Sequence, residues 1–303
     1  MIGHSLVGAV RQTKERSLGL ARSGRDCLAD SHTLPAEVPL ERKFLQQVWQ
    51  TLRYKAAGQG LALSTNERRL LTFANRHEGQ RAFVIGNGPS LRACDLGLLE
   101  NDVTFAVNGI FLADFVPTYY VVEDIFVAED RADEINSFRG PTKFFGNYLR
   151  YCLEDTPDTI WLNVRYCYDD YDGFPYFSRN AGRMVWTGGT VTYLCLQLAY
   201  YMGFSEVYLI GFDHSYSIPE SAVIQGTAIR STEDDPNHFN NSYFGSGYRW
   251  HDPRVDRMEL AYARARQVFE ASGRSVYNAT VGGHLDVFER RQYASLFDDR
   301  GAA

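Results

Sequence analysis

Residues 82–91 of this 303-residue chain read AFVIGNGPSL. The apolar run at the start is typical of a buried strand, and the glycines and proline after it predict a tight turn into a helix. Glycines let the backbone approach a ligand closely, and their amides can face a phosphate group. The alternative is a turn that uses Gly and Pro for geometry alone, because the stretch is neither a Walker motif nor a complete dinucleotide fingerprint. We predict a nucleotide-binding turn, with these contact residues: Gly86, Asn87, Gly88 and Ser90.

Similar short apolar runs recur downstream, each separated from the next by a turn or a helix-length segment. The predicted strands are 82–85, 104–107, 119–122, 143–145, 160–164, 206–210 and 275–278. Helices are predicted over 189–202, ended by Gly203, and from Pro253 to about residue 271, capped by Asp252. This alternation predicts an α/β fold with a Rossmann-like, mostly parallel sheet flanked by helices.

The chain divides into regions of different character. Residues 214–250 are polar and aromatic without clear periodicity, which is typical of a functional loop or lid. The predicted regions are a partly helical N-terminal extension (1–78, with helices over 39–58 and 66–77), a Rossmann-like nucleotide-binding catalytic domain (79–295, with a lid-like insertion at about 214–250) and a flexible tail (296–303).

The composition excludes several classes of protein. Hydrophobic residues make up 45% and charged residues 22%, as in folded domains. The net charge of -6 argues against a nucleic-acid partner, which would need a basic stripe. No window approaches the roughly 18 apolar residues of a spanning helix, and the stretch Met1–Ala9 is too short and interrupted for a signal peptide. We therefore expect a cytoplasmic protein without a transmembrane segment, and the aromatic content of 14% is compatible with a homo-oligomer.

The cysteines form no Cys-x-x-Cys pair, and their scattered positions predict reduced thiols. They are Cys27, Cys94, Cys152, Cys167 and Cys195.

Polar residues follow the predicted strands at their carboxyl ends, where open α/β sheets bind ligands. Asn108 follows the second strand, and Glu123 and Asp124 follow the third. Such side chains suit recognition of a ribose, a base or an acceptor, or else they cap the next element. Asp213 and His214 follow the strand at 206–210 and could touch the ligand or orient each other.

Two further segments precede predicted helices. The run Thr187, Gly188, Gly189 stands before the helix that ends at Gly203, where free amides could receive a phosphate or carboxylate. Thr187 or Thr190 could equally serve only as the cap. His251 stands before the helix that begins near Pro253, and a histidine there is a candidate general base.

A metal site has weaker support. Asp234, Asp235 and His238 lie close in sequence, and Mg²⁺ takes one or two carboxylates plus substrate phosphates. The spacing favours solvated loop acids, so no cofactor is required. If a metal is used, its ligands are expected among Asp124, Asp213 and Asp235.

Taken in order, these motifs resemble the domain family named for the archaeal 6-hydroxymethylpterin diphosphokinase, over about residues 80–290. The matching stretches are Val84–Leu91, Thr187–Gly189, Tyr208–Tyr216, Asp234–Phe239, Tyr243–Pro253 and Arg274–Gly283. Bacterial members of that family accompany surface-polysaccharide and flagellin-glycosylation genes. The same order of motifs is similar to the bacterial sialyltransferases that use CMP-sialic acid.

The second resemblance implies specific roles. It implies that the Gly-Asn-Gly-Pro-Ser turn binds the cytidine nucleotide, that Asn108 contacts the donor and that His251 is the general base. Tyr243 and Tyr248 correspond to the paired tyrosines that steady the phosphate. This chain departs from the pattern at Glu123-Asp124, where those enzymes carry an asparagine, and the departure bears on the identity of the donor.

Three functions follow for testing. The first is a glycosyltransferase that passes a CMP-activated acidic sugar to a surface glycan or another hydroxyl acceptor. The second is a diphosphokinase that passes pyrophosphate from ATP to a hydroxymethyl group and needs Mg²⁺. The third is a nucleotide-binding module without catalysis.

Overall fold

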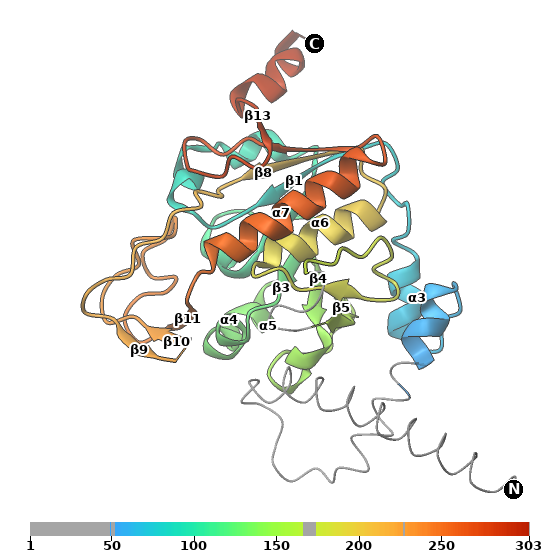
Figure 1. Cartoon of the computed structure of the whole chain (residues 1–303), viewed down its shortest axis with the longest axis horizontal. Helices are drawn as coiled ribbons and strands as arrows, with labels where there is room; N and C mark the ends of the chain where they lie inside the picture. Colours follow the sequence, from blue (N-terminus) through green and yellow to red (C-terminus); the bar gives the residue numbers. More distant parts are fainter. Residues whose placement is uncertain (1–48, 50–51, 166–173, 227, 303) are drawn as a thin grey trace, which may run out of the picture. The chain divides into compact units, whose positions relative to one another are not determined.

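A computed structural model describes residues 49, 52–165, 174–226 and 228–302 (Figure 1). The chain divides into two compact units, and the unit made of Leu52–Arg165 and Pro175–Ala303 carries the sheet and all the elements below. Most of the predicted N-terminal extension, including the first part of the helix expected at 39–58, lies outside the described residues. Residues 52–58 are helical, as predicted.

The predicted α/β fold is confirmed, because the unit is built on an eight-stranded sheet in the order β13-β12-β8-β1-β2-β3-β4-β5. Every pair of neighbouring strands in it is parallel. The strands of this sheet are β1 (Arg81–Ile85), β2 (Val103–Val107), β3 (Tyr119–Val122), β4 (Thr142–Gly146), β5 (Thr159–Leu162), β8 (Glu206–Ile210), β12 (Ser275–Asn278) and β13 (Glu289–Arg290).

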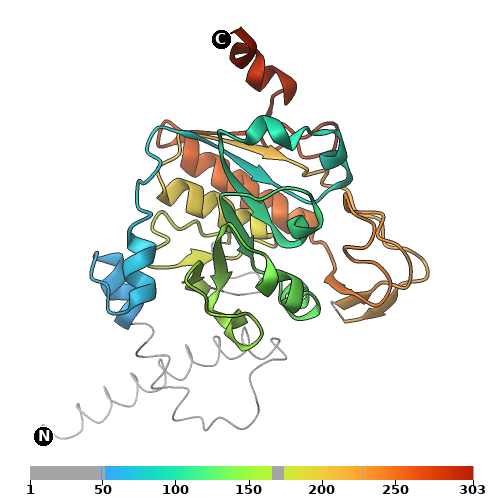
Figure 2. The ribbon, with the colours of Figure 1, turned by 180° about the vertical axis from the view of Figure 1, so that it is seen from behind.

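Helices of two kinds connect the strands. The α-helices are α3 (Thr65–Leu71), α4 (Ile125–Asp130), α5 (Ala132–Ser137), α6 (Val191–Tyr201) and α7 (Val255–Glu270). The 3₁₀ helices are η1 (Pro89–Ala93), η2 (Leu96–Leu99), η3 (Asn108–Leu112), η4 (Asn147–Tyr151) and η5 (Ala294–Ala302). Helices α6 and α7 lie side by side on one face of the sheet in Figure 1, and behind the strands in Figure 2.

Helix α6 is buried over almost its whole length, because it lies against both the sheet and α7. Its cap is Thr190, whose hydroxyl accepts a hydrogen bond from the amide of Thr192, and this settles the choice left open between Thr187 and Thr190. Helix α7 buries one stripe, including Ala261, Ala265 and Phe269, at helical spacing. The expected start of α7 was wrong: Arg254 is its N-cap, without a side-chain hydrogen bond.

The register of the central strands places the predicted motifs at one edge. Ile85, at the end of β1, pairs with Ala106 of β2 and with Ile210 of β8. The segments that follow these strands therefore leave the sheet at the same level. The strand order also reverses at β1, and such a switch point is where open α/β sheets bind ligands.

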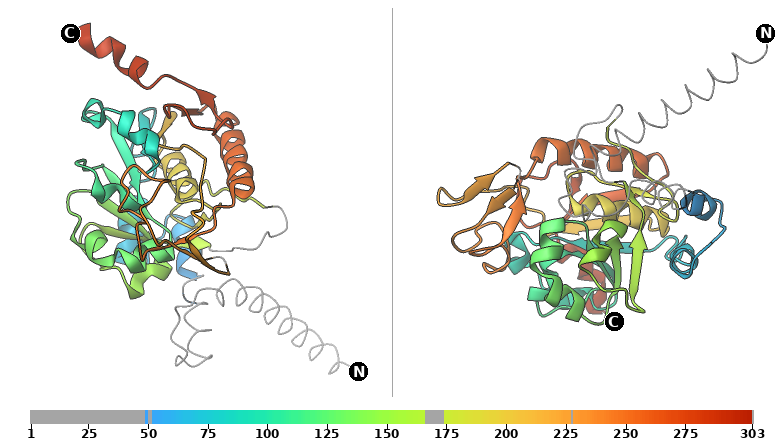
Figure 3. Two further views of the ribbon diagram at one scale, coloured as in Figure 1. Left: turned by 90° about the vertical axis from the view of Figure 1, so that its left-hand side faces the viewer. Right: turned by 90° about the horizontal axis from the view of Figure 1, so that it is seen from below.

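The segment 214–250, called the lid segment below, contains two short strands and the start of a third. Strands β9 (Val223–Gln225), β10 (Ala228–Arg230) and β11 (Arg249–His251) form an antiparallel sheet in the order β11-β10-β9. Figure 3 shows these strands beside the main sheet.

Three smaller differences from the sequence-based expectations have local causes. The strand expected at 160–164 breaks at Asn163, whose carbonyl accepts from Val185, and β6 (Val164–Arg165) pairs separately with β7 (Val185–Trp186). The tail expected at 296–303 is helical as η5 through residue 302, and the ring of Phe297 stacks on Phe83 at 5.8 Å. The helix expected at 66–77 ends at Leu71 as α3.

Cys94, Cys152 and Cys195 are free thiols, and the other two cysteines lie outside the described residues. None of the helices in the described part of the chain combines the length and apolarity needed to cross a bilayer.

Candidate functional site

The glycine turn after β1 packs directly on the loop after β8. The amide of Gly86 donates to the carbonyl of Ile210 at 2.8 Å, and that of Gly88 donates to the carbonyl of Gly211 at 2.9 Å. A Cβ atom at Gly88 would lie 1.9 Å from a carboxylate oxygen of Asp213. The glycines are therefore required by this close approach, independently of any ligand.

Asp213 occupies the amide end of η1. Its carboxylate accepts from the Ser90 hydroxyl at 2.7 Å and from the Ser90 amide at 3.2 and 3.3 Å. A negative charge at the start of a helix is favourable, and here the chain supplies that charge itself. Ser90 and Asp213 are therefore bonded to each other. Their predicted roles in nucleotide binding stay predictions.

Three buried polar atoms beside this turn make no hydrogen bond within the described residues: Asn87 Oδ1, Asn108 Oδ1 and Tyr243 OH. Asn87 Nδ2 donates to the carbonyl of Val107 at 2.9 Å, which brings Asn87 next to Asn108. The ring of Tyr243 lies against Gly109, where an added Cβ atom would be 2.5 Å from it. An unsatisfied buried polar atom costs about 1–3 kcal/mol, so three together indicate a place for a ligand.

His251 and Asp124 form a pair at the same edge. His251 Nδ1 lies 2.9 Å from Asp124 Oδ2, and the imidazole stacks on the ring of Phe126 at 4.1 Å. The other oxygen of Asp124 accepts from the amides of Phe126 and Val127 at the start of α4. Burial opposes ionisation of Asp124, but the charge and hydrogen bond of His251 and these amides outweigh it and lower its pKa. The carboxylate thus stays charged and fixes the orientation of the imidazole.

Glu123 is buried beside this pair, with 7% of its surface exposed. Burial and then the charge of Asp124 raise its pKa, and with the opposing charge of Arg257 the pKa is about 8. Glu123 is therefore mostly protonated at neutral pH, and it differs in charge from its neighbour Asp124.

The segment Thr187–Gly189 lies at the start of α6, close to α7. The Thr187 hydroxyl donates to the carbonyl of Arg165 at 3.3 Å. Gly188 packs against Tyr193 and Ala261, and Gly189 has a φ of +80°. This close packing against α6 and α7 is a structural reason for both glycines.

His214 also contacts α7. Its Nε2 lies 3.3 Å from Glu259 Oε1, and its φ is 54°. Arg257, two residues before Glu259 on α7, lies 3.3 Å from the position of a Cβ atom at Gly189. The charge of Arg257 also acts to lower the pKa of Glu123. Helix α7 therefore links the Thr187–Gly189 segment to Glu123 at the end of β3.

The lid tyrosines are held by a residue that the sequence did not single out. Arg131, between α4 and α5, donates to the carbonyls of Ser242 and Tyr243, and its guanidinium lies 3.7 Å from the centre of the Tyr248 ring. The amide of Phe239 donates to the carbonyl of Asn87 at 2.7 Å. The lid segment therefore contacts both the glycine turn and α4–α5.

The carboxylates considered for a metal do not form a shared site. Asp124 bonds to His251, Asp213 to Ser90, and Asp235 to His238 and to the amides of Asn237 and Phe244. In the portion of the chain that the structure describes, no three His, Cys, Asp or Glu side chains gather as metal ligands. Each of these three carboxylates is therefore bonded separately within the protein, and their role as metal ligands stays a prediction.

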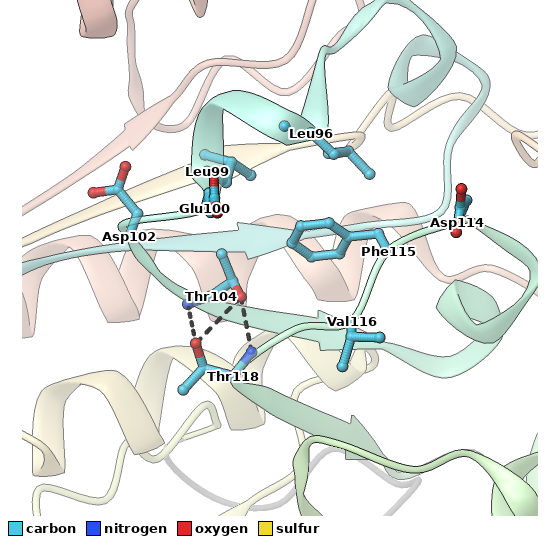
Figure 4. A pocket seen from close by; sticks show the side chains of 10 residues that line it. Leu96, Leu99, Glu100, Asp102, Thr104, Asp114, Phe115, Val116 and Thr118 are labelled. Atoms are coloured by element: carbon cyan, nitrogen blue, oxygen red, sulfur yellow. Dashed lines mark hydrogen bonds between the residues drawn. The ribbon is translucent and has the colours of Figure 1, made fainter. Parts of the chain in front are cut away.

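A separate pocket of about 370 Å³ lies at the opposite end of the sheet (Figure 4). It is lined by residues that precede or begin β2 and β3, among them Asp102, Thr104 and Phe115. Thr104 and Thr118 bond to each other there, the Thr118 amide donating to the Thr104 hydroxyl at 2.9 Å. This pocket contains none of the predicted site residues, and the carboxyl ends of the strands remain the candidate site.

Comparisons with known proteins identify a family and a similar solved structure. The family described as "6-hydroxymethylpterin diphosphokinase MptE-like" matches residues 62–219, just over half of the chain. The MAf glycosyltransferase from Magnetospirillum magneticum AMB-1 is similar in structure, with a TM-score of 0.44 and 15% sequence identity. The similarity covers 76% of this chain and only 38% of that longer chain. A comparison with curated proteins found no match.

Proposed function

Because this chain belongs to the 6-hydroxymethylpterin diphosphokinase MptE-like family, we propose that it is a nucleotide-dependent transferase. We favour a glycosyltransferase that takes an acidic sugar from a CMP-activated donor and passes it to a hydroxyl of a surface glycan. The order of motifs that resembles the CMP-sialic-acid sialyltransferases supports this choice.

The observation that carries the proposal is the pair made by Asp124 and His251. With Nδ1 donating to Asp124 at 2.9 Å, the nitrogen of the neutral ring that can accept a proton is Nε2. Stacking on Phe126 fixes the plane of the imidazole. An oriented imidazole at the ligand-binding edge of the sheet suits a general base.

The proposed reaction is a direct displacement. His251 Nε2 accepts the proton of the acceptor hydroxyl while the acceptor oxygen bonds to the anomeric carbon of the sugar. The bond from that carbon to the donor phosphate breaks, and the phosphate leaves with the electron pair. Charge that develops on the phosphate must be stabilised by groups already in place.

The donor side is proposed to use the polar groups around the glycine turn. Asn87, Asn108 and Tyr243 each hold a buried polar atom without a partner in the described residues, and all three lie where the nucleotide is expected. The remaining predicted contacts are Gly86, Gly88, Ser90, Thr187, Gly188, Gly189, Asp213 and Tyr248.

The diphosphokinase reading is the second candidate, because the family description names that activity. It would bind ATP with Mg²⁺, and thermal unfolding with CMP, CDP, AMP and ATP, each with and without Mg²⁺, separates the two. Stabilisation by CMP without metal supports the glycosyltransferase, because a ligand that binds only the folded state raises the melting temperature. Stabilisation by ATP only with Mg²⁺ supports the diphosphokinase, and no shift with any nucleotide contradicts both.

The first prediction concerns His251. His251→Asn should lower the rate of CMP release from CMP-sialic acid with sugar acceptors by about 10²–10⁴-fold, because the general base is lost. The affinity for CMP should stay close to that of the wild type. His77→Asn is the control, since His77 bonds to Tyr119 near the amino ends of the strands. Equal rates for His251→Asn and the wild type would contradict the assignment of His251 as the base, and equal rates at the level of the uncatalysed reaction would favour a module without catalysis.

A further inference from the structure

The lid segment holds a second Asp–His pair that the proposed reaction does not yet use. His238 Nδ1 lies 2.7 Å from Asp235 Oδ2. Asp235 is 4% exposed, and it also accepts from the amides of Asn237 at 2.8 Å and Phe244 at 2.9 Å. The carboxylate is therefore fixed on three sides and orients the imidazole, as Asp124 orients His251.

The backbone places His238 directly beside the glycine turn. The next residue, Phe239, donates its amide to the carbonyl of Asn87 at 2.7 Å. Arg92, on η1, donates to the carbonyl of Phe239 at 2.6 Å and to that of His238 at 3.4 Å. The backbone of His238 and Phe239 is thus bonded to the glycine turn and to η1.

The ring of His238 also faces Tyr243. The two ring centres are 4.5 Å apart, edge to face. Tyr243 is 1% exposed and its hydroxyl makes no hydrogen bond within the described residues, so it is a buried group that awaits a partner. Burial raises the pKa of this hydroxyl, and Asp124, Tyr120 and Asp235 raise it further, so it remains a neutral donor. Tyr243 thus lies within the electrostatic range of both Asp–His pairs.

The electrostatic environment of a bound phosphate differs between the two sides of the glycine turn. The carboxylate of Asp213 already holds the amide and hydroxyl of Ser90, so a phosphate at that position would meet a like charge. The side of the turn that faces His238 and Tyr243 offers donors instead. With Nδ1 bonded to Asp235, Nε2 is the ring nitrogen that points away from it, and it donates to a phosphate when the ring carries both protons.

We propose that His238, oriented by Asp235, binds the phosphate of the nucleotide through Nε2, together with the hydroxyl of Tyr243. This rests on the proposed function, because it names the residue that contacts the leaving group of that reaction. The two histidines then act on opposite sides of the transferred sugar, His251 at the acceptor hydroxyl and His238 at the departing phosphate.

A purely structural role for His238 makes a different prediction. In that case the pair only stabilises the fold of the lid segment, and any substitution that keeps the bond to Asp235 leaves nucleotide affinity unchanged. His238→Asn separates the two roles, because its amide nitrogen can replace Nδ1 towards Asp235 but ends short of Nε2. His238→Gln is the counterpart, since its amide nitrogen can replace Nε2 but not Nδ1.

The experiment measures the dissociation constants of CMP and cytidine by calorimetry for the wild type, both variants and the control His77→Gln. We expect His238→Asn to weaken CMP about tenfold and to leave cytidine unchanged, as loss of a charge-assisted hydrogen bond to phosphate would. We expect His238→Gln to lose less of the preference for CMP over cytidine than His238→Asn does. If ATP is the nucleotide bound by the wild type, AMP and adenosine replace the two probes.

The outcomes distinguish this inference from the function it rests on. If the wild type binds no nucleotide, the proposed function fails and the inference fails with it. If the wild type binds CMP but His238→Asn keeps the wild-type ratio of CMP to cytidine affinity, the inference is overturned and the function stands. An equal loss of both ligands in His238→Gln alone would assign the pair to the fold of the lid. Melting temperatures of both variants identify any variant that fails to fold, and the other variant then decides.

Discussion

Two neighbouring carboxyl groups in this protein have pKa values that shift in opposite directions. Burial and the charge of Asp124 raise the pKa of Glu123 to about 8. The charge and hydrogen bond of His251 outweigh burial and lower the pKa of Asp124. Two adjacent carboxylates in one buried site would repel each other, so the proton stays on Glu123, which lacks the hydrogen bond from His251 that stabilises the charged form of Asp124. The arrangement gives the site one fixed negative charge and one neutral carboxylic acid at neutral pH.

This difference predicts a pH-dependent stability. The pKa of Glu123 is raised from 4.5 to about 8 on folding. The stabilisation of the folded state that this shift provides is therefore complete below pH 4.5 and is lost as the pH rises towards 8. Glu123→Gln cannot lose a proton, so its free energy of unfolding should gain on that of the wild type between pH 5 and pH 8. The gain should be on the order of a few kcal/mol.

Urea unfolding of both proteins at pH 5, 6.5 and 8 measures this gain. Glu100→Gln is the matched control, because Glu100 is exposed. Wild-type and Glu123→Gln stabilities that run parallel across this range would show that Glu123 is charged in the folded protein.

At the scale of elements, the junction between β11 and α4 positions the proposed base. The amide of Arg249 donates to Asp130 at 2.9 Å, and its guanidinium bonds to Glu129 at 2.8 Å and to Asp130. The same guanidinium lies 4.7 Å from the centre of the Phe126 ring, on which His251 also stacks. Arg249 and His251 thus attach one face of β11 to α4.

Arg249→Gln should loosen this junction without touching the ligand. We expect a loss of about 1–3 kcal/mol in stability from the lost charged hydrogen bonds. We also expect a fall of roughly tenfold in kcat with little change in the affinity for CMP, because only the base is displaced. Hydrogen exchange of residues 249–251 and steady-state rates measure the two effects.

Arg266→Gln provides the comparison, since Arg266 forms an exposed pair with Glu270 at 2.7 Å that should contribute little. A wild-type rate in Arg249→Gln, with faster exchange in β11, would separate the order of this strand from catalysis.

Elements that depend on local pattern were predictable. The bounds of β3, β8 and β12 agree with the sequence-based prediction, because each is a short apolar run between polar residues. The start of α7 was not, since Pro253 and Asp252 form a plausible helix start that the chain does not use. The strands β9 and β10 lie in a segment without periodicity, so only their mutual pairing reveals them.

The site shows the same division. Asn87, Asn108 and His251 stand beside strand or helix ends, and simple reading of the sequence selects them. Ser90 and Asp213 are 123 positions apart in the sequence, and Arg131 and Tyr243 are 112 positions apart. No local sequence pattern predicts contacts at such separations. Asp235 and His238 had a local signal in their i,i+3 spacing, but we weighed it only as a metal motif and favoured solvated loop acids.

On the scale of the whole molecule, burial is concentrated in the sheet and reduced in the lid strands. The last four residues of β1 and of β8 are buried, whereas all three residues of β9 are exposed. Regions with few buried contacts open locally at low free-energy cost. The lid strands should therefore open far more often than the centre of the sheet.

Hydrogen exchange tests this gradient. Amides of β1 and β8 should exchange at the rate set by global unfolding, and those of β9 many times faster. Addition of CMP should slow exchange between residues 235 and 248 and leave α3 unchanged, because the nucleotide is proposed to contact His238 and Tyr243. Protection by CMP confined to the pocket at the amino ends of β2 and β3 would move the binding site there.

The hydrogen bond from the Phe239 amide to the Asn87 carbonyl has a pharmacological consequence. This bond holds His238 beside the glycine turn on which the nucleotide is proposed to bind. A small molecule that separated Phe239 from Asn87 would move His238 away and weaken donor binding without resembling the donor. Screening for compounds that raise the melting temperature and are displaced by CMP would find such inhibitors.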